Sequence, residues 1–276
     1  MSSCGAEVNG NAAVPPGNTE SLTVWDDGVV LPTAASADAG TRAHPATGRR
    51  VTGPAAAGLV MAWISVVLWL DSDGSLTLQR VLGVLTWVLL AWVLWGEAPL
   101  VRAQTAIVVA FATLVEYTFA PGFEVYTYRF DNVPAYVPPG HGLVYLAALG
   151  LGRSVFVRAH LRSCVGAAVA VGGGWAVWGV VWAEQTDVLG AFWYACLVGF
   201  LLWGPSRPLY VGAFVVVSYL EVVGTHLGTW VWQPHDPTGI VAIGNPPSGA
   251  AGGYGWFDLA ALLLAPGLLR MFTRRR

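Results

Sequence analysis

Eight apolar stretches, separated by more polar segments, dominate the chain between residues 54 and 272. They are continuous rather than alternating, and most approach the roughly 20 residues that a helix needs to cross a bilayer core. Backbone groups inside lipid must be hydrogen-bonded internally, which favours helices. We therefore predict transmembrane helices over residues 54–70, 78–95, 102–120, 142–157, 165–183, 188–203, 208–228 and 256–272.

The first 53 residues lack this pattern. They are rich in Ser, Ala, Pro, Gly and Asp and cannot bury enough apolar surface to offset the entropy lost on ordering. We predict a disordered cytoplasmic tail over residues 1–53, followed by a polytopic domain over 54–276. The tail has no charged segment leading directly into an apolar core, so a cleaved signal peptide is not expected.

Composition supports a membrane class. The chain is 55% apolar and 11% charged, against roughly 25% charged residues in soluble domains. It has no lysine and a net charge of −2, which offers no basic face for nucleic acid. Cys4, Cys164 and Cys196 are isolated and without metal-ligand spacing, so they are interpreted as small packing residues plus one tail cysteine.

Arginines and acids divide between alternate loops. Twelve of the fourteen arginines lie in the tail, in alternate loops or after the last helix, and only Arg80 and Arg129 fall on the other side. By the positive-inside rule, both termini are cytoplasmic in a cell membrane, and the loops 122–140 and 229–255 are extracytoplasmic. That side also collects acids, namely Asp71, Asp73, Glu124, Asp131, Glu184, Asp187 and Asp236.

The two halves of the domain resemble each other. Residues 140–149 and 253–262 align without gaps and are identical at six of ten positions. Upstream, Glu116 and Glu221 each lie in an apolar helix that leads into a loop with a Pro-Pro pair. We predict an all-α integral membrane fold of about eight helices in two parallel four-helix repeats, about 54–157 and 165–272.

Glu116 and Glu221 are the leading candidates for chemistry. A carboxyl group in an apolar membrane helix costs about 3 kcal/mol on insertion scales and normally faces the bundle interior or a wet cavity. Burial favours its neutral form, which can donate a proton. Gly224 and Gly228 share the face of Glu221 and allow close approach of a helix or a ligand. Alternatively, each acid only ties helices together through a neighbouring polar group.

Three further polar residues lie near the predicted helix ends. Asp258 begins the last helix, where a favourable helix-terminus charge also explains an acid. His226 follows Glu221 by five residues and need not share its helical face. His141 begins the fourth helix, in the position aligned with Tyr254, and is otherwise an interfacial polar residue.

Aromatic residues follow both acids. The alternation in Tyr126-Thr127-Tyr128 and Trp230-Val231-Trp232 predicts short extended segments with both rings on one side. Aromatics at a membrane boundary are commonly belt residues, but ring faces also attract cations. An acid beside such rings suits protonation of an alkene and containment of the carbocation. The expected substrate-binding residues are Tyr126, Tyr128, His141, Trp230, Trp232, Tyr254 and Trp256.

The segment 116–138, EYTFAPGFEVYTYRFDNVPAYVP, resembles part of the polytopic carotenoid 1,2-hydratase family. The matching positions are Glu116, Gly122, Tyr126, Tyr128, Pro134, Val137 and Pro138. The resemblance implies addition of water to an end-group double bond of a linear carotenoid, in the membrane and without a redox cofactor. The second, Trp-rich loop matches no pattern of that family, and membrane terpene cyclases and lycopene-cyclase-type proteins also pair buried acids with aromatics.

The candidate residues and motifs of the sequence favour metal-free acid–base chemistry. The chain has no GxSxG, HExxH, P-loop or Asp-rich magnesium motif, so neither metal nor cofactor is expected. We predict hydration or cyclisation of an isoprenoid or carotenoid-like lipid, with Glu116 or Glu221 as proton donor and with Asp258 and His226 as further catalytic candidates. Two alternatives remain open: a proton- or cation-coupled transporter of small molecules or lipids, and a membrane scaffold subunit.

Overall fold

The computed structural model describes residues 22–24, 30–32 and 53–273. The chain divides into two units, Met1–His44 and Pro45–Arg276. In the first unit, β1 (Leu22–Val24) pairs antiparallel with β2 (Val30–Pro32), so that Leu22 lies opposite Pro32. Apart from these strands and Gly53, the predicted disordered tail, residues 1–53, lies outside the described residues.

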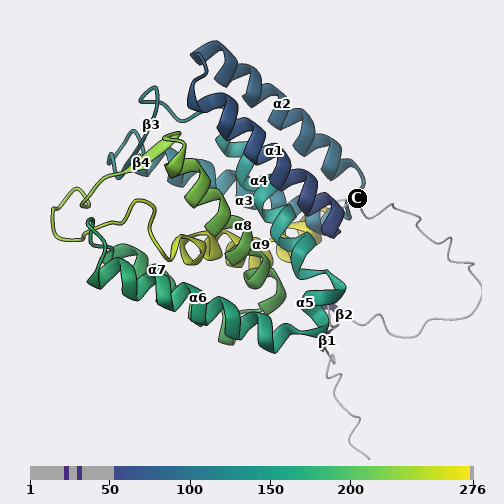
Figure 1. Cartoon of the computed structure of the whole chain (residues 1–276). Helices are drawn as coiled ribbons and strands as arrows, with labels where there is room; N and C mark the ends of the chain where they lie inside the picture. The colour runs from purple at the N-terminus through teal and green to yellow at the C-terminus, as the bar shows by residue number, and fades with distance from the viewer. Residues whose placement is uncertain (1–21, 25–29, 33–52, 274–276) are drawn as a thin grey trace, which may run out of the picture. The chain divides into compact units, whose positions relative to one another are not determined.

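The described part of the second unit is mostly helical, and each of the eight predicted stretches overlaps a helix (Figure 1). A short additional helix, α5, follows α4. The helices are α1 (Pro54–Ser72), α2 (Leu76–Trp95), α3 (Pro99–Phe119), α4 (Val137–Gly152), α5 (Val155–Ala159), α6 (Leu161–Val181), α7 (Val188–Trp203), α8 (Arg207–His226) and α9 (Ala250–Thr273).

Six of these helices, α1, α2, α3, α6, α8 and α9, are long and apolar enough to cross a membrane. The apolar helix α7 and helix α4 have 16 residues each and are shorter than a typical span. Large apolar side chains such as Trp69, Val84 and Trp92 are exposed on the outer surface, where a soluble protein would place polar groups. The chain is therefore a helical membrane protein.

Most helices begin earlier than the sequence predicts, and the difference is largest, at five and six residues, for α4 and α9. Helix α4 starts at Val137 and includes Pro138 and Pro139 in its first turn, where the missing N–H of proline is tolerated. Helix α9 starts at Ala250, so its glycine-rich start is helical rather than a loop. Consequently His141 lies in the second turn of α4 rather than at its beginning.

The early start of α9 also overturns one interpretation. Asp258 lies more than two turns inside the helix, and no acid occupies the first turn of α9. Because the charge preference of a helix terminus fades within one turn, that preference does not account for Asp258. Its side chain is buried instead, with 4% of its surface exposed.

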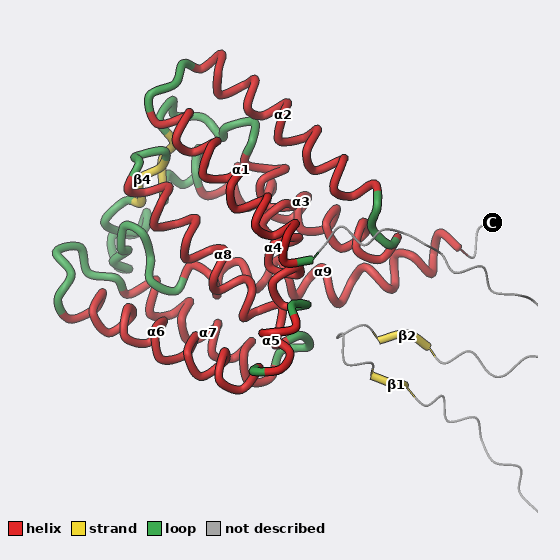
Figure 2. The backbone as a smooth tube through the Cα atoms, turned by 45° about the vertical axis from the view of Figure 1, so that its right-hand side comes forward, coloured by secondary structure: helices red, strands yellow, loops and turns green. Residues whose placement is uncertain are grey.

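The helices that follow the acids in one half pack against the acid-bearing helices of the other half. Helix α4 contacts α8, and α9 contacts α3, while α1 lies against α4 and α7 against α9. In Figures 1 and 2, α4 and α8 run through the middle of the helical unit, with α1 and α2 on one side and α6 and α7 on the other. This arrangement brings Glu116 of α3 and Glu221 of α8 to one region.

Two short strands join the loops of the two halves. Strand β3 (Tyr126–Tyr128) pairs antiparallel with β4 (Trp230–Trp232), so that Tyr126 faces Trp232 and Tyr128 faces Trp230. In both strands the outer two rings are buried and the middle residue is more exposed. The predicted extended segments, each with both rings on one side, are therefore confirmed.

Two buried aspartates hold the loops that lead into α4 and α9. Asp71, at the end of α1, accepts hydrogen bonds from the Gln79 amide and from the Tyr136 hydroxyl just before α4. Asp187, just before α7, accepts from the backbone N–H groups of Gly190, Gly244 and Ser248. Each aspartate thus connects the first helical hairpin of its half to the loop that carries the aromatic pair.

Candidate active site

Glu116 lies near the end of α3 with 6% of its surface exposed. Its Oε2 accepts hydrogen bonds from the hydroxyl groups of Tyr126 and Tyr128, each at 2.9 Å. Its Oε1 lies 2.8 Å from Nε2 of His141 on α4. Both oxygens are therefore engaged, by two neutral donors and by an imidazole that forms an ion pair when protonated.

The two tyrosines act on Glu116 as hydrogen-bond donors. Burial, reinforced by the neighbouring Glu116 carboxylate, raises the pKa of Tyr126 and of Tyr128 well above the usual value for a phenol. Both hydroxyl groups therefore keep their protons across the physiological range, and both point these protons at Glu116.

Glu221 lies on α8 with 3% of its surface exposed. Its Oε2 accepts hydrogen bonds from the indole N–H groups of Trp230 and Trp232, each at 3.1 Å. Among the residues that the structure describes, none donates to the other oxygen, Oε1. Gly224, one turn after Glu221, makes room for this contact, because a Cβ at this position would overlap the ring of Trp230.

The two carboxylate clusters meet through their aromatic rings. The ring centroids of Tyr126 and Trp232 are 4.5 Å apart, and those of Tyr128 and Trp230 are 6.2 Å apart. Because β3 and β4 are paired, these ring contacts are fixed by the strand register. Each acid is thus bound by the aromatic pair of its own loop, and the two pairs pack on each other.

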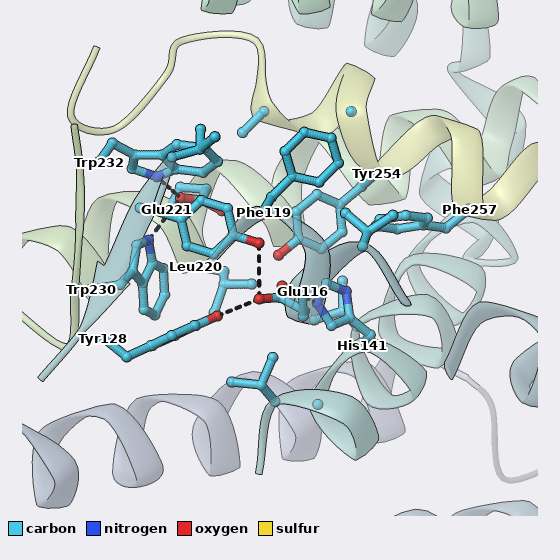
Figure 3. Close-up of a pocket in the computed structure, with 18 of the residues that line it drawn as sticks. Glu116, Phe119, Tyr128, His141, Leu220, Glu221, Trp230, Trp232, Tyr254 and Phe257 are labelled. Carbon is cyan, nitrogen blue, oxygen red and sulfur yellow. Dashed lines mark hydrogen bonds and ion pairs between the residues drawn. The ribbon is translucent and has the colours of Figure 1, made fainter. Parts of the chain in front are cut away.

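Both clusters line one large cavity of about 850 Å³ (Figure 3). In Figure 3 the labelled side chains of Glu116, Glu221 and His141 point toward a common space bordered by aromatic rings. The ring of His141 stacks on that of Tyr254 at 5.0 Å. Because the walls are largely apolar side chains with a few convergent polar groups, the cavity suits a mainly apolar ligand.

Nine of the eleven predicted site residues line this cavity. They are Glu116, Glu221, Tyr126, Tyr128, His141, Trp230, Trp232, Tyr254 and Trp256. Asp258 lies outside it and borders a second, much smaller cavity with His141. His226, at the end of α8, is exposed and is not among the residues that line either cavity.

Other cavity residues carry no sequence signal of their own. Trp193 of α7 packs its ring 5.7 Å from that of Trp232, and Phe257 of α9 packs 5.5 Å from His141. The loop residues 236–238 and 241 also border the cavity. Each of these residues belongs to a segment rich in apolar or turn residues, so only the packing of distant helices identifies them as lining.

The charged groups of the cavity are carboxylates and one imidazole. Within residues 22–24, 30–32 and 53–273, no three His, Cys, Asp or Glu side chains form a group that could hold a metal ion. The arrangement can donate a proton, accept a proton and surround a cation with ring faces.

Comparison with protein-family models, curated proteins and solved structures gives no match for this chain. Its function therefore has to be inferred from the site itself.

Proposed function

We propose that the protein is a membrane-embedded enzyme that performs acid-initiated alkene chemistry, hydration or cyclisation, on an isoprenoid or carotenoid-like lipid. The observation that carries the proposal is the placement of two buried carboxylates on the wall of a single cavity of about 850 Å³. An apolar ligand enters such a cavity readily, and within it an acid is close to any double bond that reaches the aromatic cluster.

Of the two acids, Glu221 is the better proton donor, because it has two neutral hydrogen-bond donors whereas Glu116 has two such donors and an imidazole that stabilise its ionised form. Both indole N–H groups bind Oε2 of Glu221, which leaves Oε1 to carry a proton at the cavity wall. Transfer of this proton to one alkene carbon leaves a carbocation at the other. The rings of Trp230, Trp232 and Tyr126 are close enough to Glu221 to stabilise that positive charge through their faces.

Glu116 is suited to the second half of the reaction. Its two tyrosine donors and His141 stabilise the ionised carboxylate, which can orient a water molecule or accept its proton. In hydration, the water oxygen bonds to the carbocation and loses one proton to Glu116. In cyclisation, a second double bond attacks the carbocation, and the base removes a proton from carbon.

We further propose the eight-span topology with two parallel repeats, both termini cytoplasmic and the aromatic loops extracytoplasmic. Three correspondences between the halves support it. Each acid binds its own aromatic pair, each half has one buried aspartate that holds a loop, and His141 and Tyr254 occupy the same position counted from the starts of α4 and α9.

The test combines lipid analysis with carboxamide variants. Wild-type protein purified in mild detergent is compared with Glu116→Gln, Glu221→Gln and the double variant by mass spectrometry of copurifying and added isoprenoids. The expected result is a product heavier by one water, or an isomer, with wild type, and a loss of on the order of 100-fold or more in each single variant. The control is Glu184→Gln, which makes the same change from carboxyl group to carboxamide at an exposed position in the α6–α7 loop. Normal turnover by both single variants would overturn the proposal.

A transporter is the second candidate, favoured by the buried pair of Glu116 and His141 at 2.8 Å, since ionisable pairs within membrane helices commonly carry protons or ions. Its signature is proton-coupled uptake into vesicles that Glu116→Gln abolishes. Uptake of this kind, together with only bulk phospholipid bound to the purified protein, would favour transport over catalysis.

A further inference from the structure

A second cavity lies beside the large one, where α3, α4, α8 and α9 meet. Its volume is about 10 Å³, which is at the lower limit for one water molecule. The wall is apolar except for His141, Asp258 and the two tyrosines Tyr145 and Tyr254. The cavity therefore touches both the imidazole that binds Glu116 and the buried acid of α9.

Two residues that line this cavity have a buried polar atom without a hydrogen-bond partner among the described residues: Nδ1 of His141 and Oδ2 of Asp258. The hydroxyl group of Tyr210 on α8, near Asp258 but outside the cavity lining, is also unpartnered. His141 and Asp258 are 6% and 4% exposed, respectively. Buried polar groups are normally satisfied, and leaving one unsatisfied costs about 1–3 kcal/mol. A single water molecule in the small cavity would satisfy Nδ1 of His141 and Oδ2 of Asp258 at once, and two to four polar partners are what a buried water needs.

The ring of His141 places its two nitrogens in different surroundings. Nε2 is engaged by Glu116 at 2.8 Å, so Nδ1 is the nitrogen left for the small cavity. The Tyr145 hydroxyl already donates to Oε1 of Gln104 at 3.0 Å, which leaves Asp258 as the unsatisfied group across the cavity. Glu116 is therefore hydrogen-bonded to His141, and His141 and Asp258 border the same cavity of about the size of one water molecule.

We propose that Asp258 exchanges a proton with Glu116 through His141 and one water molecule in the small cavity. In one state, Glu116 is ionised, His141 carries its proton on Nε2, and Asp258 is neutral. Asp258 gives its proton to the water, the water gives another to Nδ1, and Nε2 gives its proton to Glu116. The result is neutral Glu116, His141 protonated on Nδ1, and ionised Asp258, with no net gain or loss of protons.

The exchange sets which of the two buried acids is ionised. With the proton on Asp258, Glu116 is a carboxylate that can orient or deprotonate water; with the proton on Glu116, it can act as an acid. This use of the exchange rests on the proposed function, but the exchange itself needs no substrate. Asp258 is accordingly a positioning residue that acts on the cavity through His141.

Infrared spectroscopy of the purified protein without substrate tests the exchange, because a neutral carboxyl group has a C=O stretching band that a carboxylate lacks. Asp258→Asn and Glu221→Gln identify the bands of these two acids by their loss. Glu116→Gln removes the other acceptor of the shared proton, so the Asp258 band is expected to gain intensity. In a His141→Phe background, Glu116→Gln is expected to leave the Asp258 band unchanged.

Val217→Ile is the matched steric control, because Val217 lines the small cavity and the extra carbon fills it without altering a polar group. In protein that carries Val217→Ile, as in protein that carries His141→Phe, Glu116→Gln should leave the Asp258 band unchanged. Thermal unfolding checks that each variant is folded. If Glu116→Gln leaves the Asp258 band unchanged in folded protein that retains His141, the proposed proton exchange is wrong, whatever the enzymatic activity. Conversely, if Glu116→Gln changes the Asp258 band but the protein turns over no isoprenoid, the proposed function is wrong and the proposed exchange is supported.

Discussion

Gly224 determines how closely an aromatic ring can approach Glu221. A Cβ at this position would overlap the six-membered ring of Trp230, whose indole N–H binds the carboxylate. We expect Gly224→Ala to displace this ring and to lower the free energy of unfolding by about 2 kcal/mol, the scale of leaving a buried polar group without its hydrogen-bond partner. Thermal unfolding in detergent measures the change, and Trp230→Phe should reproduce much of it.

Gly174 supplies the matched control for this prediction. It lies within helix α6, is exposed and would place a Cβ in open space. Gly174→Ala should therefore be neutral, or slightly stabilising because alanine loses less backbone entropy in a helix. An equal loss of stability in both alanine variants would mean that contact with Trp230 is not what requires glycine at position 224.

At the residue scale, local pattern predicted some of the site and missed the rest. The burial of Glu116 and Glu221 followed from the cost of exposing a carboxylate to lipid, and the inward rings of β3 and β4 followed from strand alternation. The contact of His141 with Glu116 could not be predicted, since it spans 25 residues and depends on how α3 packs on α4. Nothing local distinguished Trp193 from a belt residue either.

Asp187 links two elements across the second half. Its carboxylate accepts from Gly190 N–H at the start of α7 and from Gly244 and Ser248 N–H in the loop before α9, at 2.9, 2.9 and 2.7 Å. We expect Asp187→Ala to lower the free energy of unfolding by about 3 kcal/mol, because buried N–H groups lose a charged acceptor. Thermal unfolding measures this loss of stability, and the amount of lipid that copurifies with the variant measures its effect on the cavity.

Glu184 provides a nearby comparison for Asp187. It is an exposed acid in the same α6–α7 loop, so Glu184→Ala should change stability by less than about 0.5 kcal/mol. If Asp187→Ala proved equally mild, the loop before α9 would be held by its other contacts, such as the bond from the Gln185 amide to the Ile243 carbonyl at 2.6 Å.

At the element scale, hydrophobic runs predicted the presence of the helices but not every boundary. The start of α9 was missed because its glycines resemble a loop. Close packing explains them: a Cβ on Gly252 would meet the Trp193 carbonyl oxygen, and one on Gly249, just before the helix, would meet the backbone of α7. Glycine serves here for helix contact rather than for flexibility, and only the packed structure separates these two uses.

At the scale of the whole helical unit, four loops gather at one end, as the proposed eight-span topology requires. Arg129 donates to the Gly74 carbonyl, which joins the α1–α2 loop to the loop before α4. Val125 accepts from Gln233 N–H, which joins the two aromatic loops, and Asp187 joins the α6–α7 loop to the loop before α9. The site therefore lies at the end of the helical unit that carries these loops, and in the proposed topology the arginine distribution assigns this end to the outer membrane surface.

Cysteine labelling decides which surface this is. Ile240 in the loop 229–249 and Val155 at the start of α5 are almost equally exposed, at 83% and 85%, but they are predicted on opposite sides of the membrane. In a background without Cys4, Cys164 and Cys196, a membrane-impermeant maleimide added to intact cells should label Ile240→Cys and spare Val155→Cys. Permeabilised cells should show both labelled, which establishes that each thiol is reactive. Labelling of Val155→Cys alone in intact cells would invert the topology, place the two acids near the cytoplasmic surface, and require a ligand that reaches the cavity from the inner leaflet.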